Sequence, residues 1–170
     1  NETSRMWYYL KREHIALKNG GDPNEQTLFH GSKTNSYKVI IQEGLDHRVA
    51  NLGGSIGAGI YFGQESTISE SYVPYNNNMF QHPNLMFLNP MYPNHRGKKR
   101  SHQPYNHPPP PATRQMLMCR VVLGSCVPGQ GGLRRPPQKN DGELHDSVSG
   151  PGMFVVFENS QSYPEYLIHF

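Results

Sequence analysis

Two short stretches of this chain carry the residues that could do chemistry. Residues 28–32 are an apolar run that ends in a histidine, a glycine and a hydroxyl, His30, Gly31 and Ser32. Residues 53–62 are dense in glycine and run into an aromatic segment that contains Tyr61. Glycine has no Cβ, so the backbone there can approach a ligand closely. The spacing is not that of a P-loop or a Rossmann fingerprint, and the glycine-rich stretch taken alone is more typical of a hairpin or bulge than of a ligand site.

Composition limits what the rest of the chain can be. A length of 170 residues fits one domain with a single core. The net charge of +3 is mildly basic, and a local basic run does not identify a nucleic-acid binder. Cys119 and Cys126 have neither zinc spacing nor a disulfide framework, which favours reduced thiols in an intracellular protein. We see no signal peptide or membrane-length apolar run, and the missing initial methionine predicts a piece of a longer protein.

Helical periodicity predicts the elements of the first half. Trp7, Leu10, His14 and Leu17 recur at helical spacing and predict an amphipathic helix with these residues on its apolar face. A second helix is expected over residues 35–43, and a short one over residues 66–72. Residues 45–55, between these two helices, are expected to form a mobile polar loop.

Apolar runs predict the strands, which dominate the rest of the chain. They are expected at residues 27–30, 60–62, 116–124, 153–157 and 166–170. The run at 116–124 is apolar on both faces, so we expect it to be central. Helices that lie mostly early and strands that pair across long separations predict an α+β fold.

Residues 74–113 interrupt this pattern. They hold an asparagine run, a basic run, several histidines and a proline run, and we treat them as an irregular insertion in a single domain of residues 1–170. The histidines lack cysteine or acidic residues at ligand spacing, so we expect a solvated loop and no metal. A solvated loop is also favoured over an RNA-contacting arm, because base-stacking platforms normally lie on a rigid sheet.

Six motifs, taken in order, resemble the catalytic domain of the poly(ADP-ribose) polymerase family. They lie at residues 28–32, 57–62, 69 with 72, 119–124, 146–148 and 163–168. The helix near the start and the end of the chain are most similar to the mono-ADP-ribosyltransferase branch that carries macrodomains, and the loop 53–62 is more similar to the tankyrases. The resemblance implies an ADP-ribosyltransferase fold of two packed, mainly antiparallel sheets with helices around them. It also implies one more strand before the first helix, so we expect a missing N-terminal segment.

The resemblance further implies a cleft for NAD+. Gly31 would bind the nicotinamide carboxamide through its backbone and Ser69 through its hydroxyl. Tyr72 and Tyr61 would enclose the nicotinamide ring between two flat aromatic walls.

The adenosine half of NAD+ would lie against a second group of residues. His30 would hydrogen-bond the adenosine ribose, and Ser32 and Arg48 would contact that ribose and the pyrophosphate or adenine. Each residue also has an ordinary structural interpretation: Arg48, for example, could be a solvated loop charge. Only their ordered coincidence favours the site.

The residue at position 153 decides which reaction the resemblance implies. Polymerases of the family place a glutamate at the start of this strand, where it stabilises an oxocarbenium-like transition state and activates a ribose hydroxyl. The matching residue here is Met153, so the catalytic set is His30, Tyr61 and Met153. Ile68 stands where the polymerases carry a lysine. A register with Glu158 or Glu165 as the acid would need a strand slip that turns the strand faces inside out.

These features predict an NAD-dependent protein mono-ADP-ribosyltransferase, in which an acidic acceptor side chain could supply the missing carboxylate. Two alternatives stay open: a catalytically silent domain that binds NAD or a partner, and an ADP-ribosyltransferase that acts on nucleic-acid ends. Retention of His30, Tyr61, Ser69 and Tyr72 favours an active enzyme over a silent one. We expect a monomeric domain of a larger protein.

Overall fold

The computed structural model describes residues 1–33, 36–73 and 114–170. The chain divides into one compact unit, Asn1–Pro74 with Gln115–Phe170, and a second, Tyr75–Arg114. The first unit is described below. The predicted insertion, with its histidines and basic run, lies outside the described residues. Each helix in the described part of the chain is too short or too polar to cross a membrane.

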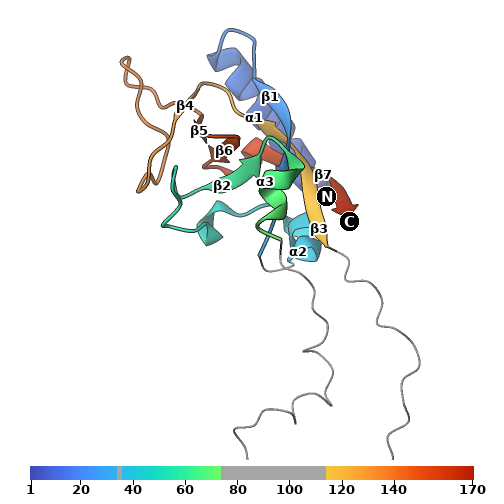
Figure 1. The fold of residues 1–170 in the computed structure, drawn as a ribbon. Helices are drawn as coiled ribbons and strands as arrows, with labels where there is room; N and C mark the ends of the chain where they lie inside the picture. The colour runs from blue at the N-terminus through green and yellow to red at the C-terminus, as the bar shows by residue number, and fades with distance from the viewer. Residues whose placement is uncertain (34–35, 74–113) are drawn as a thin grey trace, which may run out of the picture. The chain divides into compact units, whose positions relative to one another are not determined.

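The first unit is built on a mixed sheet (Figure 1). Its strands in the described residues are β1 (Glu25–His30), β2 (Ile60–Gly63), β3 (Gln115–Val122), β4 (Cys126–Pro128), β5 (Ser147–Gly150), β6 (Met153–Val156) and β7 (Ser162–His169). They are arranged in the order β4-β5-β6-β2-β1-β3-β7, and every neighbouring pair is antiparallel except β4 with β5. The predicted α+β class with mainly antiparallel pairing is confirmed.

The hydrogen bonds run through one continuous sheet, where two packed sheets were expected. The link between the two halves is narrow, because β1 and β2 meet at the single pair Phe29 and Gly63. β1 continues alongside β3 over its whole length, and β2 continues alongside β6. The strands β1 and β2 therefore diverge beyond this pair.

The first helix, α1 (Glu2–Lys18), buries a different face from the one predicted. Asn1 caps it by accepting a hydrogen bond from the Thr3 amide at 2.9 Å. Tyr8 and Ile15 pack against Val122 of β3. The predicted apolar face is wrong, since Trp7 is 57% and Leu17 is 84% exposed.

A polar network on the sheet explains this orientation. Glu25 accepts hydrogen bonds from Tyr8 at 2.7 Å and from Arg12 at 2.8 Å, and pairs with Arg120 at 2.8 Å. Tyr8 and Arg12 belong to α1, so their bonds to a carboxylate on β1 hold the Tyr8 face of the helix against the sheet. Helical spacing alone could not show which apolar stripe would meet that carboxylate.

Three short helical elements of the described residues lie between β1 and β3. Helix α2 (Tyr37–Glu43) ends at Gly44, whose φ of 87° favours glycine. The loop after it, which was expected to be a mobile polar loop, contains the 3₁₀ turn η1 (His47–Val49), capped by Asp46. Helix α3 (Ser66–Glu70) is shorter than the predicted 66–72, so Tyr72 follows its end. A further 3₁₀ turn, η4 (Asn159–Gln161), precedes β7.

The main core lies where α2 covers the middle of the sheet. It joins Leu28 of β1, Phe62 of β2 and Leu117 of β3 with Tyr37 of α2, all of them almost fully buried. β3 is paired on both sides, as its apolar pattern predicted. Both cysteines are free thiols, and burial raises the pKa of Cys119 far above its usual range. Cys119 is therefore an inert core residue.

Candidate active site

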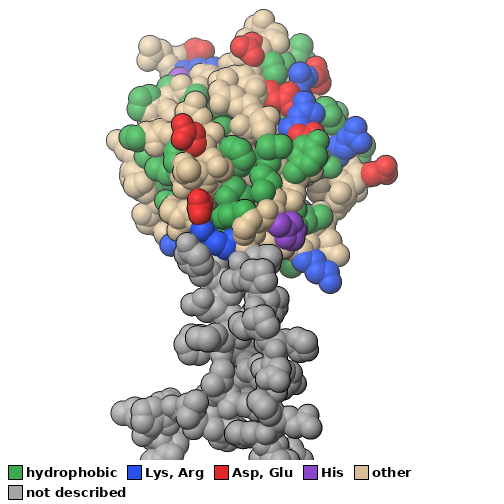
Figure 2. Space-filling view, turned by 45° about the vertical axis from the view of Figure 1, so that its right-hand side comes forward, with side chains coloured by type: hydrophobic (Ala, Val, Ile, Leu, Met, Phe, Trp, Pro, Cys, Tyr) green, Lys and Arg blue, Asp and Glu red, His purple; other side chains and the backbone are tan. Residues whose placement is uncertain are grey.

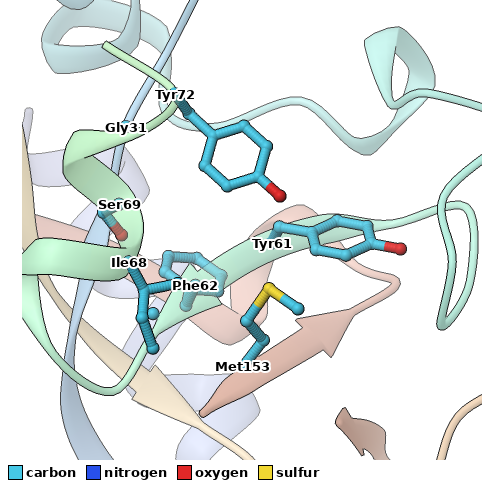
Figure 3. A pocket seen from close by; sticks show the side chains of 8 residues that line it. Gly31, Tyr61, Phe62, Ile68, Ser69, Tyr72 and Met153 are labelled. Carbon is cyan, nitrogen blue, oxygen red and sulfur yellow. The ribbon is translucent and has the colours of Figure 1, made fainter. Parts of the chain in front are cut away.

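A pocket opens where β1 and β2 diverge (Figure 3). Its cavity volume is about 50 Å³, and it is lined by Gly31, Tyr61, Phe62, Gly63, Ile68, Ser69, Tyr72 and Met153. These residues come from the end of β1, from β2, from α3 and the turn after it, and from the start of β6. Figure 3 shows Tyr61, Tyr72 and Met153 around the same space. Five predicted site residues are thus brought together: Gly31, Tyr61, Ser69, Tyr72 and Met153.

Helix α3 packs directly onto the end of β1. A Cβ on Gly31 would lie 2.1 Å from the carbonyl oxygen of Ser69, so only glycine allows this contact. Ser69 is 3% exposed and its hydroxyl donates to the carbonyl oxygen of Phe29 at 2.8 Å. These two contacts fix the wall of the pocket. The sequence predicted that Gly31 permits close ligand approach, and the structure shows that α3 also needs this glycine.

The two tyrosines differ in how firmly they are held. The Tyr61 hydroxyl accepts a hydrogen bond from the Ile56 amide at 3.1 Å and donates one to the Gly57 carbonyl oxygen at 2.8 Å. Tyr72 is 39% exposed, and the Lys33 ammonium lies 5.7 Å from its ring centroid. Tyr61 therefore forms a fixed wall and Tyr72 an open one. Enclosure of a nicotinamide ring between them stays a prediction.

His30 lies behind the pocket and does not line it. Its Nδ1 is 2.9 Å from the carbonyl oxygen of Tyr61. A carbonyl can only accept, so Nδ1 carries the proton and the neutral ring keeps Nε2 as an acceptor. Burial lowers the pKa of His30 and outweighs the opposing effect of this hydrogen bond, so the ring is neutral at pH 7. The Nδ1 of His30 thus holds β2 at Tyr61, and its Nε2 can accept a hydrogen bond from a hydroxyl.

Ser32 and Arg48 also lie outside the pocket lining. The backbone amide of Ser32 donates to the Tyr37 hydroxyl at 3.0 Å. The Arg48 side chain is 78% exposed and grips Asp46, with Nε to Oδ1 at 2.9 Å and Nη2 to Oδ2 at 2.7 Å. The hydrogen bonds from Arg48 lower the pKa of Asp46 to about 2. The predicted adenosine contacts of both residues stay predictions.

Met153 begins β6 and is half-buried in the pocket wall, opposite Gly63 of β2. Ile68 of α3 packs nearby, against Gly152 in the turn between β5 and β6. A Cβ on Gly152 would lie 2.5 Å from Ile68 Cδ1. The alternative acids lie elsewhere: Glu158 pairs with Lys11 at 2.8 Å, and Glu165 is exposed on β7. The register with Glu158 or Glu165 as the catalytic acid is therefore wrong. No carboxylate is among the described residues that line the pocket.

Residues 5–128 match the family model described as "Poly(ADP-ribose) polymerase catalytic domain". The chain belongs to this family. It is 31% identical to the mouse Protein mono-ADP-ribosyltransferase PARP12, over 97% of the chain and 20% of the relative. It is 28% identical to the human Protein mono-ADP-ribosyltransferase PARP11, over 97% of the chain and 48% of the relative. The chain spans less than half the length of each of these proteins. The predicted resemblance is confirmed.

The sequence did not predict two residues that line the pocket, Phe62 and Gly63. Phe62 was assigned only to a strand. In the structure its ring lies 5.7 Å from that of His30. A Cβ on Gly63 would lie 2.8 Å from Ser69 Oγ, so this glycine also allows α3 to approach. A glycine that directly follows an apolar strand run was the available signal.

The residues described for this poly(ADP-ribose) polymerase catalytic domain contain no group of three or more His, Cys, Asp or Glu that could hold a metal ion. The histidines of the predicted insertion lie outside the described residues.

Proposed function

We propose that this poly(ADP-ribose) polymerase catalytic domain is an NAD-dependent protein mono-ADP-ribosyltransferase. It would break the bond between nicotinamide and ribose in NAD+, transfer one ADP-ribose to an acceptor protein and release nicotinamide. The observation that carries the proposal is a pocket walled by Tyr61, Tyr72 and the Gly31 backbone, with a methionine at its edge. The names of the mouse and human relatives agree with it.

The pocket residues fit a flat aromatic amide. The rings of Tyr61 and Tyr72 offer apolar faces to a nicotinamide ring. The hydroxyl proton of Ser69 is used by Phe29, so Ser69 Oγ has lone pairs left to accept from a carboxamide N–H. The Nε2 of His30 would accept a hydrogen bond from a hydroxyl of the adenosine ribose.

The charge of the site determines how far the reaction goes. When the glycosidic bond breaks, its electron pair goes to the nicotinamide nitrogen and positive charge develops on the ribose. Met153 can neither stabilise that charge nor take a proton from a ribose hydroxyl, so the described residues that line the site include no base for chain elongation. An acidic acceptor needs no such base, because its carboxylate is already ionised and can attack C1′ of the ribose. Single transfer to an acidic side chain follows.

The two alternatives receive less support. A silent domain that binds only a partner would not need the pocket together with His30, and a silent domain that binds NAD is distinguished by the labelling test below. A modifier of nucleic-acid ends would be expected to show a cluster of basic residues near the site. Lys33 lies beside Tyr72, and the basic run lies outside the described residues. Acidic and basic side chains are mixed on the face shown in Figure 2, around a cluster of hydrophobic ones.

The free cysteines fit an intracellular location.

Labelled NAD+ tests the proposal with the purified chain and an acidic acceptor protein. One sharp labelled band is expected. A high-molecular-weight smear would mean polymer, and measurable NAD+ affinity without label would mean a binding module. The matched variants are Tyr72→Ala, in the pocket, and Tyr166→Ala, which is 57% exposed on β7. Y72A should raise the KM for NAD+ about fivefold or more through lost stacking, and Y166A should leave it unchanged.

A further inference from the structure

The glycine-rich segment before β2 forms a tight turn around a side chain from β2 itself. The Gly57 amide donates to the Gly54 carbonyl oxygen at 3.3 Å and closes the turn. The Tyr61 hydroxyl enters the turn, where it accepts from the Ile56 amide at 3.1 Å and donates to the Gly57 carbonyl oxygen at 2.8 Å. The Tyr61 hydroxyl therefore bonds to one N–H group and one carbonyl oxygen of the same turn.

Gly54 makes the room for this hydroxyl. A Cβ at this position would lie 2.3 Å from Tyr61 Oη and 2.3 Å from the Gly57 carbonyl oxygen. Its neighbour Gly53 has no such need, because the nearest atom to a Cβ there would be Asn51 Oδ1 at 3.5 Å. Of these two adjacent glycines, only Gly54 is required by the tyrosine.

The far side of the turn is anchored independently. Ile56 is 8% exposed and packs with Val148, Val155 and Phe157. The Ala58 amide donates to the Leu133 carbonyl oxygen at 2.7 Å. These contacts attach the turn to the β4-β5-β6 end of the sheet. The Tyr61 hydroxyl attaches the same turn to the edge of the pocket.

We propose that the Tyr61 hydroxyl is a latch that fixes its own ring in the orientation needed to bind nicotinamide, and that Gly54 is a positioning residue that permits it. The inference rests on the proposed function for its kinetic consequence only. Two hydrogen bonds at the tip of the ring remove its rotational freedom before the ligand arrives, which is preorganisation. Without the latch, only a fraction of molecules presents the ring correctly, and the apparent affinity falls by that fraction.

Hydrogen exchange of the Ile56 amide tests the latch without any ligand. Tyr61→Phe keeps the ring and removes the hydroxyl, and Gly54→Ala fills the space that the hydroxyl occupies. Gly53→Ala is the matched control. The Ile56 amide should lose protection about tenfold in Y61F and G54A and keep it in G53A. The Ala58 amide should stay protected in all three, because its acceptor is Leu133. Unchanged Ile56 protection in Y61F would overturn the proposal.

Steady-state kinetics test the consequence for NAD+. The KM should rise about tenfold in Y61F and in G54A, with kcat within about twofold, because saturating NAD+ draws the population back to the competent state. The double variant should be no worse than either single one, since both break the same contact. A fall in kcat at unchanged KM would place the hydroxyl at the reacting atoms and overturn the latch. A wild-type chain that turns over no NAD+ would count against the proposed function, and the Ile56 exchange would still decide the latch.

Discussion

The two nitrogens of His30 do different work, and a pair of variants separates them. Nδ1 donates to the carbonyl oxygen of Tyr61 at 2.9 Å, which leaves Nε2 as the acceptor for a ribose hydroxyl. In His30→Asn the side-chain amide lies near the position of Nδ1 and can still donate to that carbonyl oxygen. In His30→Gln the longer side chain places its amide near Nε2 and loses the bond to Tyr61. Both variants lose the ring contact with Phe62, so this loss cancels when they are compared.

The magnitudes follow from what each variant leaves unpaired. In H30Q the Tyr61 carbonyl oxygen loses its side-chain partner, which costs about 1–3 kcal/mol of unfolding free energy relative to H30N. H30N lacks the acceptor for the ribose hydroxyl, a neutral hydrogen bond of about 0.5–1.5 kcal/mol. The Kd of H30N for NAD+ should therefore be roughly two to ten times higher than that of H30Q.

Urea unfolding and calorimetric titration with NAD+ measure the two effects on the same samples. H30N should be the more stable variant and H30Q the tighter binder. The reverse ranking in urea would show that Nδ1 is not the donor to Tyr61. Equal NAD+ affinities in the two variants would show that Nε2 does not contact the ligand.

Two further substitutions test the edge of the pocket and the frame of the fold. Met153→Glu should still give one labelled band with NAD+ on a gel, because a carboxylate alone does not supply the missing lysine, and a smear would contradict this. Asp146→Asn should lower the free energy of unfolding by about 3 kcal/mol, because Asp146 Oδ1 accepts from Lys18 at 2.8 Å and Oδ2 accepts from the Ser125 amide at 2.8 Å. An Asn amide nitrogen would face one of these donors in either orientation, and the Lys18 ammonium would lose its carboxylate. Burial acts to raise the pKa of Asp146, but the hydrogen bonds that it accepts lower it, so this stability is present above about pH 4 and lost as the pH falls below it. Urea unfolding from pH 2 to pH 7 measures this. The free energy of unfolding should fall less steeply below about pH 4 in D146N than in Asp141→Asn, an exposed control.

Much of the fold could be predicted because its signals are local. The apolar run at β3 and the glycine after α2 determine their own conformations through burial and backbone sterics. The resemblance assigned the start of β6 to Met153, and the pairing of Met153 with Gly63 agrees with it. The orientation of α1 could not be predicted in this way. Its sequence carries two apolar stripes, and the partner that selects the Tyr8 stripe is Glu25 on another element.

In the candidate site, too, the sequence determined some features and contacts between distant segments determined others. The sequence by itself determined which groups were available: two phenols, a serine, a histidine and a thioether where polymerases have a carboxylate. Only the tertiary structure decided that Arg48 is held by Asp46, that His30 stands behind the pocket, and that the Tyr61 hydroxyl sits inside the turn at Gly54. The physical reason is that side-chain chemistry belongs to each residue alone. The partner of a side chain depends on strand register and close packing between segments that are distant in the sequence.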